Sequence, residues 1–208
     1  MIGCPIFNER YVLTSEQSDD SIITGESPSV EVLTAIGKFI VTFGKLDAYA
    51  STCISVLMGA EPELVSIIAN SLQSKARFDT LRDIFAYKLD SANKIRAGLE
   101  LKNDKRFSEL DKLFDEIQKA NDIRNEIVHS EWPMYFPDAL KAHRLRWKKA
   151  KDKPGWPVAD YDLVSVKDLE DKIRFIEKVT GELSNFFSQN FSDYIRQLYT
   201  NNNDEDGR

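Results

Sequence analysis

Residues 29–59, which decide the fold, read SVEVLTAIGKFIVTFGKLDAYASTCISVLMG. Apolar residues recur in this stretch at spacings of three and four: Val32, Ile36, Phe39, Ile40, Phe43, Leu46, Ala50, Cys53, Ile54 and Leu57. That period is typical of a helix that buries one stripe, here for about seven turns. Gly59 stands where a helix stop belongs, and Pro62 suits the first turn of a following helix.

Four further helices are predicted along the chain. A short one follows Pro62, and a third begins at Ser74, which can cap it. A fourth runs from about Asp104 and ends before Pro133, since proline breaks a helix. The last begins after Ser165, which resembles a capping box with Asp168. Helices of this length with apolar stripes must pack together, so we predict an all-α bundle of about five helices.

A different pattern, with a period of two, occupies about residues 138–164. Charged and apolar side chains alternate on both sides of Lys153-Pro154-Gly155, which predicts a β-hairpin inserted before the last helix. We expect the face that carries His143, Leu145 and Trp147 to pack on the core. The opposite face carries charges, and cross-strand ion pairs are expected there between two arginines and two aspartates: Arg144, Arg146, Asp160 and Asp162.

The chain therefore divides into three parts. Residues 1–30 are polar and rich in turn formers, and we interpret them as an N-terminal arm. Residues 31–198 form one helical domain, and residues 199–208 are expected to be a disordered acidic tail.

Composition limits the classes of function. The 208 residues include 28 Lys and Arg against 34 Asp and Glu, a net charge of −6. A protein that coats nucleic acid over its whole surface should be basic, whereas one compact basic site on an acidic body stays open. The beginning of the chain does not resemble a signal peptide, and no uninterrupted apolar run approaches the ~20 residues that span a bilayer. We expect a soluble, cytoplasmic protein without a membrane partner.

The common catalytic signatures do not occur in the sequence. There is no phosphate-binding GxxxxGK[ST], no GxGxxG, no HExxH, no CxxC pair and no GxSxG. Two cysteines and two histidines supply few metal ligands, so we expect neither a metal nor a cofactor.

One stretch stands apart, ANDIRNEIVHSEW at residues 120–132, which ends the fourth helix. Asn125 and His129 are four apart and share a helix face, whereas Arg124 lies about 140° around the axis from His129. Two copies around a two-fold axis could bring both kinds of group to a shared cleft. An imidazole can carry protons near neutral pH, and a guanidinium can bind phosphate oxygens in pairs. The set fits cleavage of an RNA strand.

Arg124-Asn125-x-x-x-His129 resembles the R-x4–6-H motif of the HEPN superfamily, the higher eukaryote and prokaryote nucleotide-binding domains. Phe43-Gly44-Lys45-Leu46-Asp47 in the first helix and Trp132 after the motif are also similar to bacterial members. The resemblance covers about residues 31–198. It implies a helical bundle that dimerises with its motif helices face to face.

The resemblance further implies a metal-independent endoribonuclease, often a toxin or an antiphage effector. On that analogy Arg124 and His129 would be catalytic and Asn125 supporting. The implied partners are RNA, with tRNA as one candidate, a second copy of the chain, and an antitoxin or defence-system protein. Glu131 stands where toxins paired with an adenylyltransferase usually have a tyrosine, so the sequence departs from that pattern.

Two outer groups complete the predicted site. Lys148, Lys149, Lys151 and Lys153 near the hairpin turn have no evident partner and are candidates for RNA contact. Asp47 on the first helix could reach the motif and hold His129 or Arg124.

An alternative for the motif, which we call the bland alternative, is a purely structural role. His129 could bond free carbonyls at the helix end, and Arg124 could pair with Asp122 or Glu126. The domain would then be a non-catalytic dimerisation or partner-binding module, with Arg124 in an ion pair and His129 buried. A third reading is a binding module for a small nucleotide.

Overall fold

The computed structural model describes residues 28–59, 62–97, 105–132, 141–149 and 157–205. Five helices and a hairpin follow one another in this order: α1 (Val30–Met58), α2 (Pro62–Ser71), α3 (Ser74–Ala97), α4 (Lys105–Val128), β1 (Lys141–Lys149), β2 (Pro157–Ser165) and α5 (Val166–Glu205). This confirms the predicted all-α bundle with a hairpin before the last helix. Residues 1–27, most of the predicted arm, lie outside the described residues.

The helix ends follow the local sequence signals. The Ser29 hydroxyl accepts a hydrogen bond from the backbone N–H of Val32 at 3.3 Å and caps α1. Gly59 adopts a left-handed φ of 61°, and its N–H donates to the carbonyls of Ser55 and Val56 at 3.2 and 3.3 Å. Since a side chain is strained at positive φ, glycine is the favoured residue at this stop.

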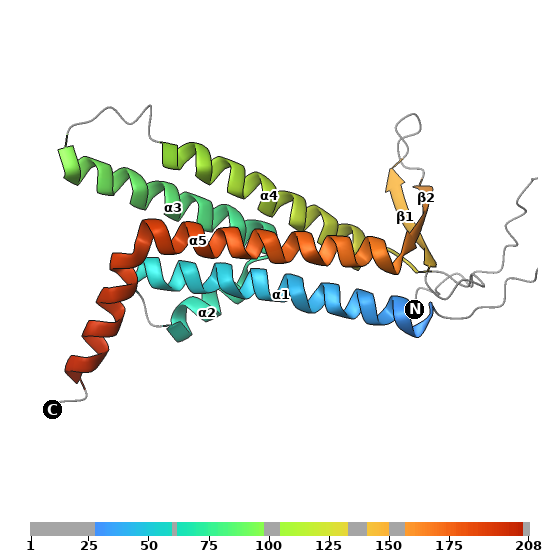
Figure 1. Cartoon of the computed structure of the whole chain (residues 1–208), viewed down its shortest axis with the longest axis horizontal. Coiled ribbons are helices and arrows are strands. Elements are labelled where there is room, and N and C mark those ends of the chain that lie inside the picture. Colours follow the sequence, from blue (N-terminus) through green and yellow to red (C-terminus); the bar gives the residue numbers. More distant parts are fainter. Residues whose placement is uncertain (1–27, 60–61, 98–104, 133–140, 150–156, 206–208) are drawn as a thin grey trace, which may run out of the picture.

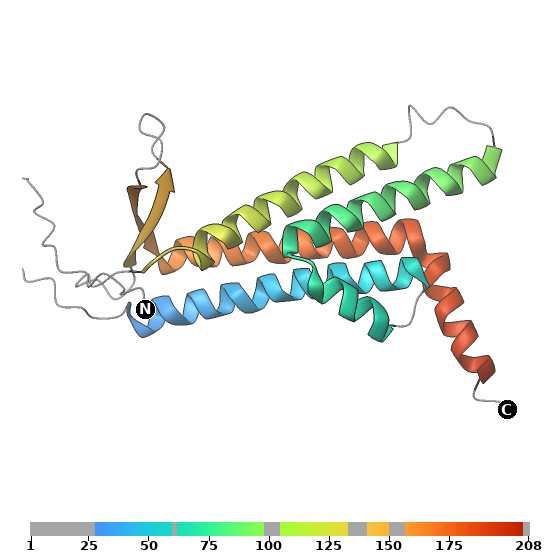
Figure 2. The ribbon, with the colours of Figure 1, turned by 180° about the vertical axis from the view of Figure 1, so that it is seen from behind.

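The bundle is two layers of paired helices. α1 and α5 lie side by side, α3 and α4 form a second pair above them, and the short α2 sits beside α1 (Figures 1 and 2). Most of the stripe read from the sequence is the buried face of α1, where Phe39, Leu46 and Ala50 are fully buried. Ile40, which was counted in the stripe, is 48% exposed.

Aromatic rings fill the core where α3, α4 and α5 meet. Phe85 is fully buried, and four other phenylalanine rings lie with their centroids 4.9 to 6.1 Å from it: Phe114, Phe186, Phe187 and Phe191. Offset and edge-on rings at such distances stabilise a core beyond the area they bury. This cluster fixes the position of α4 on α5.

Helix α1 is long and apolar enough, by length and composition alone, to cross a membrane. It was not singled out from the sequence, because an uninterrupted apolar run was required there. Four charged residues interrupt the apolar run but not the helix: Glu31, Lys38, Lys45 and Asp47. Ten of its residues are buried in the bundle.

The hairpin has the predicted strands, and its face with the arginines also contributes to the core. β1 and β2 are antiparallel, with Ala142 opposite Val164 and Arg144 opposite Asp162. Ala142 and Val164, on the face with the arginines, join the core, whereas Leu163 on the other face is 45% exposed. The expectation that the face of His143, Leu145 and Trp147 packs on the core is met only by Leu145, since the side chains of His143 and Trp147 lie outside the described residues. Leu145 is buried beside Glu131, with which it exchanges two backbone hydrogen bonds of 2.8 and 3.0 Å.

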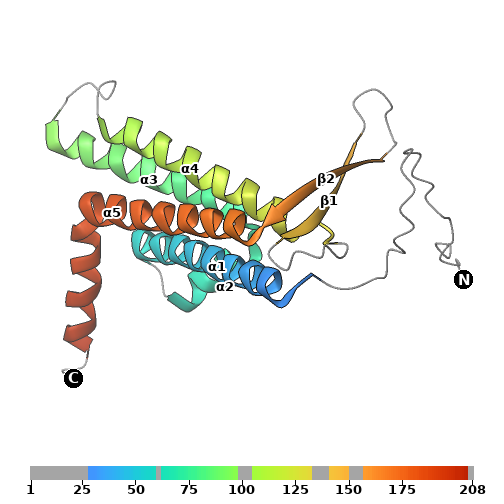
Figure 3. The same cartoon turned by 45° about the vertical axis from the view of Figure 1, so that its right-hand side comes forward.

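The last helix is longer than expected. α5 runs to Glu205, so the prediction of a disordered tail is wrong for residues 199–205. Asn and Asp cost a helix only several tenths of a kcal/mol per residue, so an established helix can continue through them. The backbone of Phe191 is non-helical (φ −131°, ψ 20°), and the segment beyond it bends away from the bundle (Figures 1 and 3).

Candidate functional site

The end of α4 presents three polar side chains on one face. Asn121, Asn125 and His129 are each four residues apart, a spacing that stacks side chains along a helix. The backbone N–H of His129 donates to the carbonyl of Asn125 at 3.1 Å, so helical geometry continues to the histidine. The motif is therefore held on a rigid helix.

Neighbouring side chains, and not His129, satisfy the free carbonyls of the last turn. The Ser130 hydroxyl donates to the Glu126 carbonyl, and the Trp132 indole N–H donates to the Ile127 carbonyl at 3.2 Å. The His129 side chain is exposed, and no hydrogen bond joins its ring to another described residue. The bland alternative, in which the histidine serves as a helix-end cap, is not what the structure shows.

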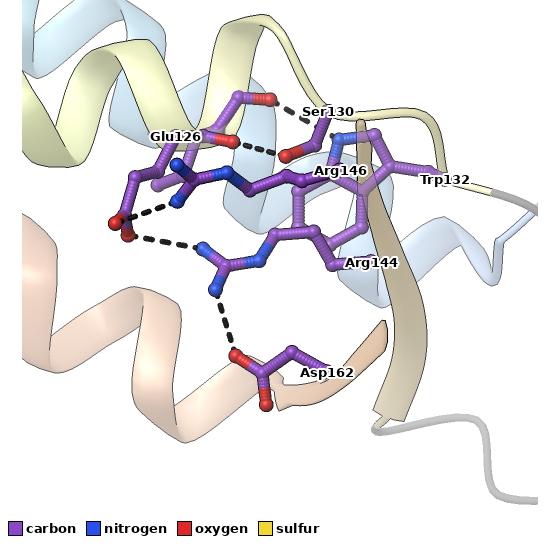
Figure 4. A network of polar contacts seen from close by, with 7 residues as sticks. Glu126, Ser130, Trp132, Arg144, Arg146 and Asp162 are labelled. Carbon is purple, nitrogen blue, oxygen red and sulfur yellow. Dashed lines mark hydrogen bonds and ion pairs between the residues drawn. The ribbon is translucent and has the colours of Figure 1, made fainter. Parts of the chain in front are cut away.

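The hairpin contacts this last turn from the opposite side of α4. We call these ion pairs the hairpin clasp; they join Glu126, Arg144, Arg146 and Asp162. The Glu126 carboxylate accepts from Arg146 at 2.7 Å and from Arg144 at 3.2 Å (Figure 4). Arg144, whose side chain is only 11% exposed, also binds Asp162 at 2.7 Å. Of the predicted cross-strand pairs, Arg144 with Asp162 is confirmed. Arg146 pairs with Glu126 on α4, and the side chain of Asp160 lies outside the described residues.

The arginines of the hairpin clasp keep the Glu126 carboxylate ionised. Burial by itself raises the pKa of Glu126, but the Arg146 and Arg144 guanidiniums outweigh it and hold the pKa of Glu126 below its usual value. The carboxylate is therefore charged and committed to the hairpin at neutral pH.

Arg124 is free of the ion pairs that the bland alternative gave it. Its Nη1 donates to the side-chain oxygen of Asn125 at 3.0 Å. The two acids proposed as its partners are engaged elsewhere, Glu126 by the hairpin and Asp122 by Gln118 at 2.8 Å. Within the described residues no carboxylate pairs with Arg124, so its guanidinium keeps donors for an anionic ligand.

These side chains line one cleft of about 630 Å³. Its α4 wall is made of Asn121, Arg124, Asn125 and His129. Its second wall is the turn from α2 into α3, made of residues 72–75, which read Leu-Gln-Ser-Lys. Arg124 and His129 thus share a cleft within a single chain, although the helix angle between them suggested that a second copy would be needed.

The second wall and Asn121 were missed by the sequence argument. Asn121 lies one turn before Asn125 on the same face, so the four-residue spacing could have identified it. Residues 72–75 meet α4 only through tertiary packing, and no local pattern signals that contact.

Asp47 supports the second wall and does not hold the motif. Its carboxylate pairs with Arg77, which is 8% exposed, and Arg77 also donates to the Leu72 carbonyl at 3.0 Å. The prediction that Asp47 holds His129 or Arg124 is therefore corrected. Through Arg77 it fixes the turn that faces them, because a buried ion pair with further hydrogen bonds is geometrically demanding.

The predicted lysines stay untested. Lys148 and Lys149 belong to β1, and their side chains are outside the described part, as are the whole of Lys151 and Lys153. Among the described residues, no three His, Cys, Asp or Glu side chains are grouped as metal ligands.

The chain was compared with protein-family models, curated proteins and solved structures. No protein-family model matches the chain, and no match was found among curated proteins or solved structures.

Proposed function

We propose that this protein is a metal-independent endoribonuclease of the HEPN type, a cytoplasmic toxin or antiphage effector that acts as a homodimer. One observation carries the proposal: Arg124, Asn125 and His129 line the same open cleft. The guanidinium lacks an ion pair and the imidazole lacks a hydrogen bond within the described chain. A buried or bonded pair could not act on a substrate.

The chemistry uses each group in a distinct role. His129 takes the proton of a ribose 2′-hydroxyl while that oxygen bonds to the adjacent phosphorus. The bond from phosphorus to the 5′-oxygen breaks, and the leaving oxygen takes a proton from an imidazolium. Arg124 stabilises the charge that builds on the phosphate oxygens. Asn125, which accepts from Arg124, orients the guanidinium. The products are a 2′,3′-cyclic phosphate and a 5′-hydroxyl.

The test is cleavage of total tRNA in excess EDTA. We expect cyclic-phosphate products with the wild-type protein and a loss of at least about a hundredfold in rate for His129→Ala and for Arg124→Ala. His143→Ala and Arg174→Ala serve as matched controls. Equal cleavage by the wild type and both motif variants would end the catalytic assignment.

The biological role has a separate test. We expect expression of the wild-type chain to arrest bacterial growth and the His129→Ala variant to relieve the arrest. Growth arrest that persists with the inactive variant would argue against a toxin that acts through its nuclease.

A second candidate, a non-catalytic association module, is favoured by one observation. Apolar side chains are exposed along α1 and α2: Val30, Leu33, Ile40, Val41, Leu64, Ile67 and Ile68. Such surfaces mark sites of association. This candidate predicts an oligomer that Ile67→Asp disrupts, while Tyr87→Asp on α3, equally exposed, does not. An oligomer in analytical sedimentation, together with no cleavage of RNA, would favour this candidate over the nuclease.

A further inference from the structure

Asn121 is a polar residue in an apolar position. It is 3% exposed, and the buried residues around it on α4 include Ile117 and Ala120. The same side chain also lines the cleft with Arg124 and His129. Asn121 therefore belongs both to the buried part of α4 and to the lining of the cleft.

The amide has no partner in the described chain. No hydrogen bond joins it to another described residue, and it is not among the polar atoms fully sealed from the cleft. Buried polar groups in native proteins are nearly always hydrogen-bonded, and each exception needs an explanation. An unpartnered side chain that lines a cleft is explained most directly by a ligand.

The chemistry of an amide narrows the class of ligand. Asn121 offers two donors on its nitrogen and an acceptor on its oxygen. A phosphate supplies only acceptors and would leave the amide oxygen unsatisfied, whereas the edge of a nucleobase supplies a donor beside an acceptor. Asparagine binds base edges through this paired geometry in other nucleic-acid complexes.

The position of the amide fits a base next to the scissile phosphate. Asn121 lies about one helical turn, about 6 Å along the axis, from Asn125, one of the groups proposed at the phosphate. The cleft volume of about 630 Å³ falls in the range of small-ligand sites. Gln73 and Ser74 on the second wall add polar groups around the same space.

We propose that Asn121 is a specificity residue that reads one nucleobase, so that the protein binds and cleaves RNA at a selected base. The cleavage part rests on the proposed function, but base-selective binding does not. A site built to hydrogen-bond a ligand strongly disfavours analogues that lack the matching groups.

The experiment measures calorimetric binding of the four nucleoside 3′-monophosphates and ribose 5-phosphate to the His129→Ala chain, which cannot turn over RNA. We expect one base to bind about tenfold to a hundredfold more tightly than the others. Asn121→Leu, similar in size, should bring the four affinities within about threefold of one another while ribose 5-phosphate binds as before. Asn185→Leu, an exposed amide on α5 outside the cleft, is the matched control.

Three outcomes would overturn the proposal: equal binding of the four nucleotides, binding of none, or an equal loss for all of them in Asn121→Leu. If that variant does not fold, Asn121→Asp replaces it, since this change removes the donors at constant size and should alter the base that is preferred.

A second measurement separates this inference from the nuclease. The ends of fragments made by the wild-type protein from random-sequence RNA should share one base at the cut. Base-selective binding without cleavage would refute the nuclease and leave Asn121 as a base reader. Cleavage without any base preference would refute the role of Asn121 and leave the nuclease.

Discussion

At the scale of single residues, the buried amide of Asn121 lowers the stability of the fold while it supplies a polar group at the site. A buried amide without a protein partner costs about 1–3 kcal/mol, and a leucine of similar size removes that cost. Because the cleft lets some solvent reach the amide, we expect a gain near the low end, about 1 kcal/mol, for Asn121→Leu. For a chain of this length that raises the Tm by about 2–4 °C in a thermal melt. A lower Tm would mean that the amide is satisfied within the fold.

Cys53 shows the opposite relation between burial and function. Burial raises the pKa of the Cys53 thiol to about 12, so the reactive thiolate is scarce at any pH where the protein works. In a Cys4→Ser background, we expect no labelling of native protein by a thiol reagent at pH 8 and full labelling in denaturant. Fast labelling of the native chain would contradict the buried position of Cys53 in α1.

At the scale of elements, the hairpin clasp on α4 should depend on Glu126. Glu126→Gln removes the carboxylate that Arg144 and Arg146 share and leaves Arg144 with Asp162 alone, and hydrogen bonds to charged groups contribute about 1.5–3 kcal/mol. We expect a loss of about 2 kcal/mol at pH 7, measured by urea unfolding, and little change for Glu170→Gln on the exposed face of α5.

The pH dependence of this clasp has a defined sign. The pKa of Glu126 is lower in the folded chain than in the unfolded one, so its stabilisation is present above the unfolded value near ~4.3. It is lost as the pH falls through the folded pKa. The difference in stability between the wild type and Glu126→Gln should therefore shrink below about pH 4. An unchanged difference at pH 3 would show that the carboxylate charge does not matter.

Elements were predicted where local chemistry decides them. The Gly59 stop and the capping box both formed, and in the box Asp168 accepts from the Ser165 N–H at 2.9 Å while the Ser165 hydroxyl accepts from the Asp168 N–H at 3.1 Å. These signals act within a few residues, so the sequence alone contains them.

The orientation of the hairpin could not be predicted in the same way. Alternation identifies two faces of a strand but not which one meets the bundle. Here Glu126 on α4 draws Arg144 and Arg146 inward, and that contact joins segments 18 and 20 residues apart. Burial does not separate the two faces either, because Leu145 is buried on the face opposite the arginines.

At the scale of the whole molecule, the cleft exists because two separate sets of contacts fix its two walls. The hairpin holds the last turn of α4 through Glu126, and Asp47 on α1 holds the opposite wall through Arg77 and the Leu72 carbonyl. The motif residues were identifiable from their spacing, whereas the second wall depends on how α2 and α3 pack on α1. The sequence therefore predicts the reactive groups but not the shape of the site that they line.

The same geometry predicts whether one cleft takes its Arg124 and His129 from one copy of the chain or from two. If the cleft were completed across a dimer, mixing Arg124→Ala with His129→Ala would restore about a quarter of the activity, because half of the dimers would be mixed and one of their two clefts would be intact. Arg124 and His129 line one cleft of one chain, so each variant lacks a needed group in every cleft it forms. We expect the mixture to be as inactive as its components in the tRNA assay, after both are denatured and refolded together. Recovery near a quarter would show that the arginine of one copy serves the histidine of the other.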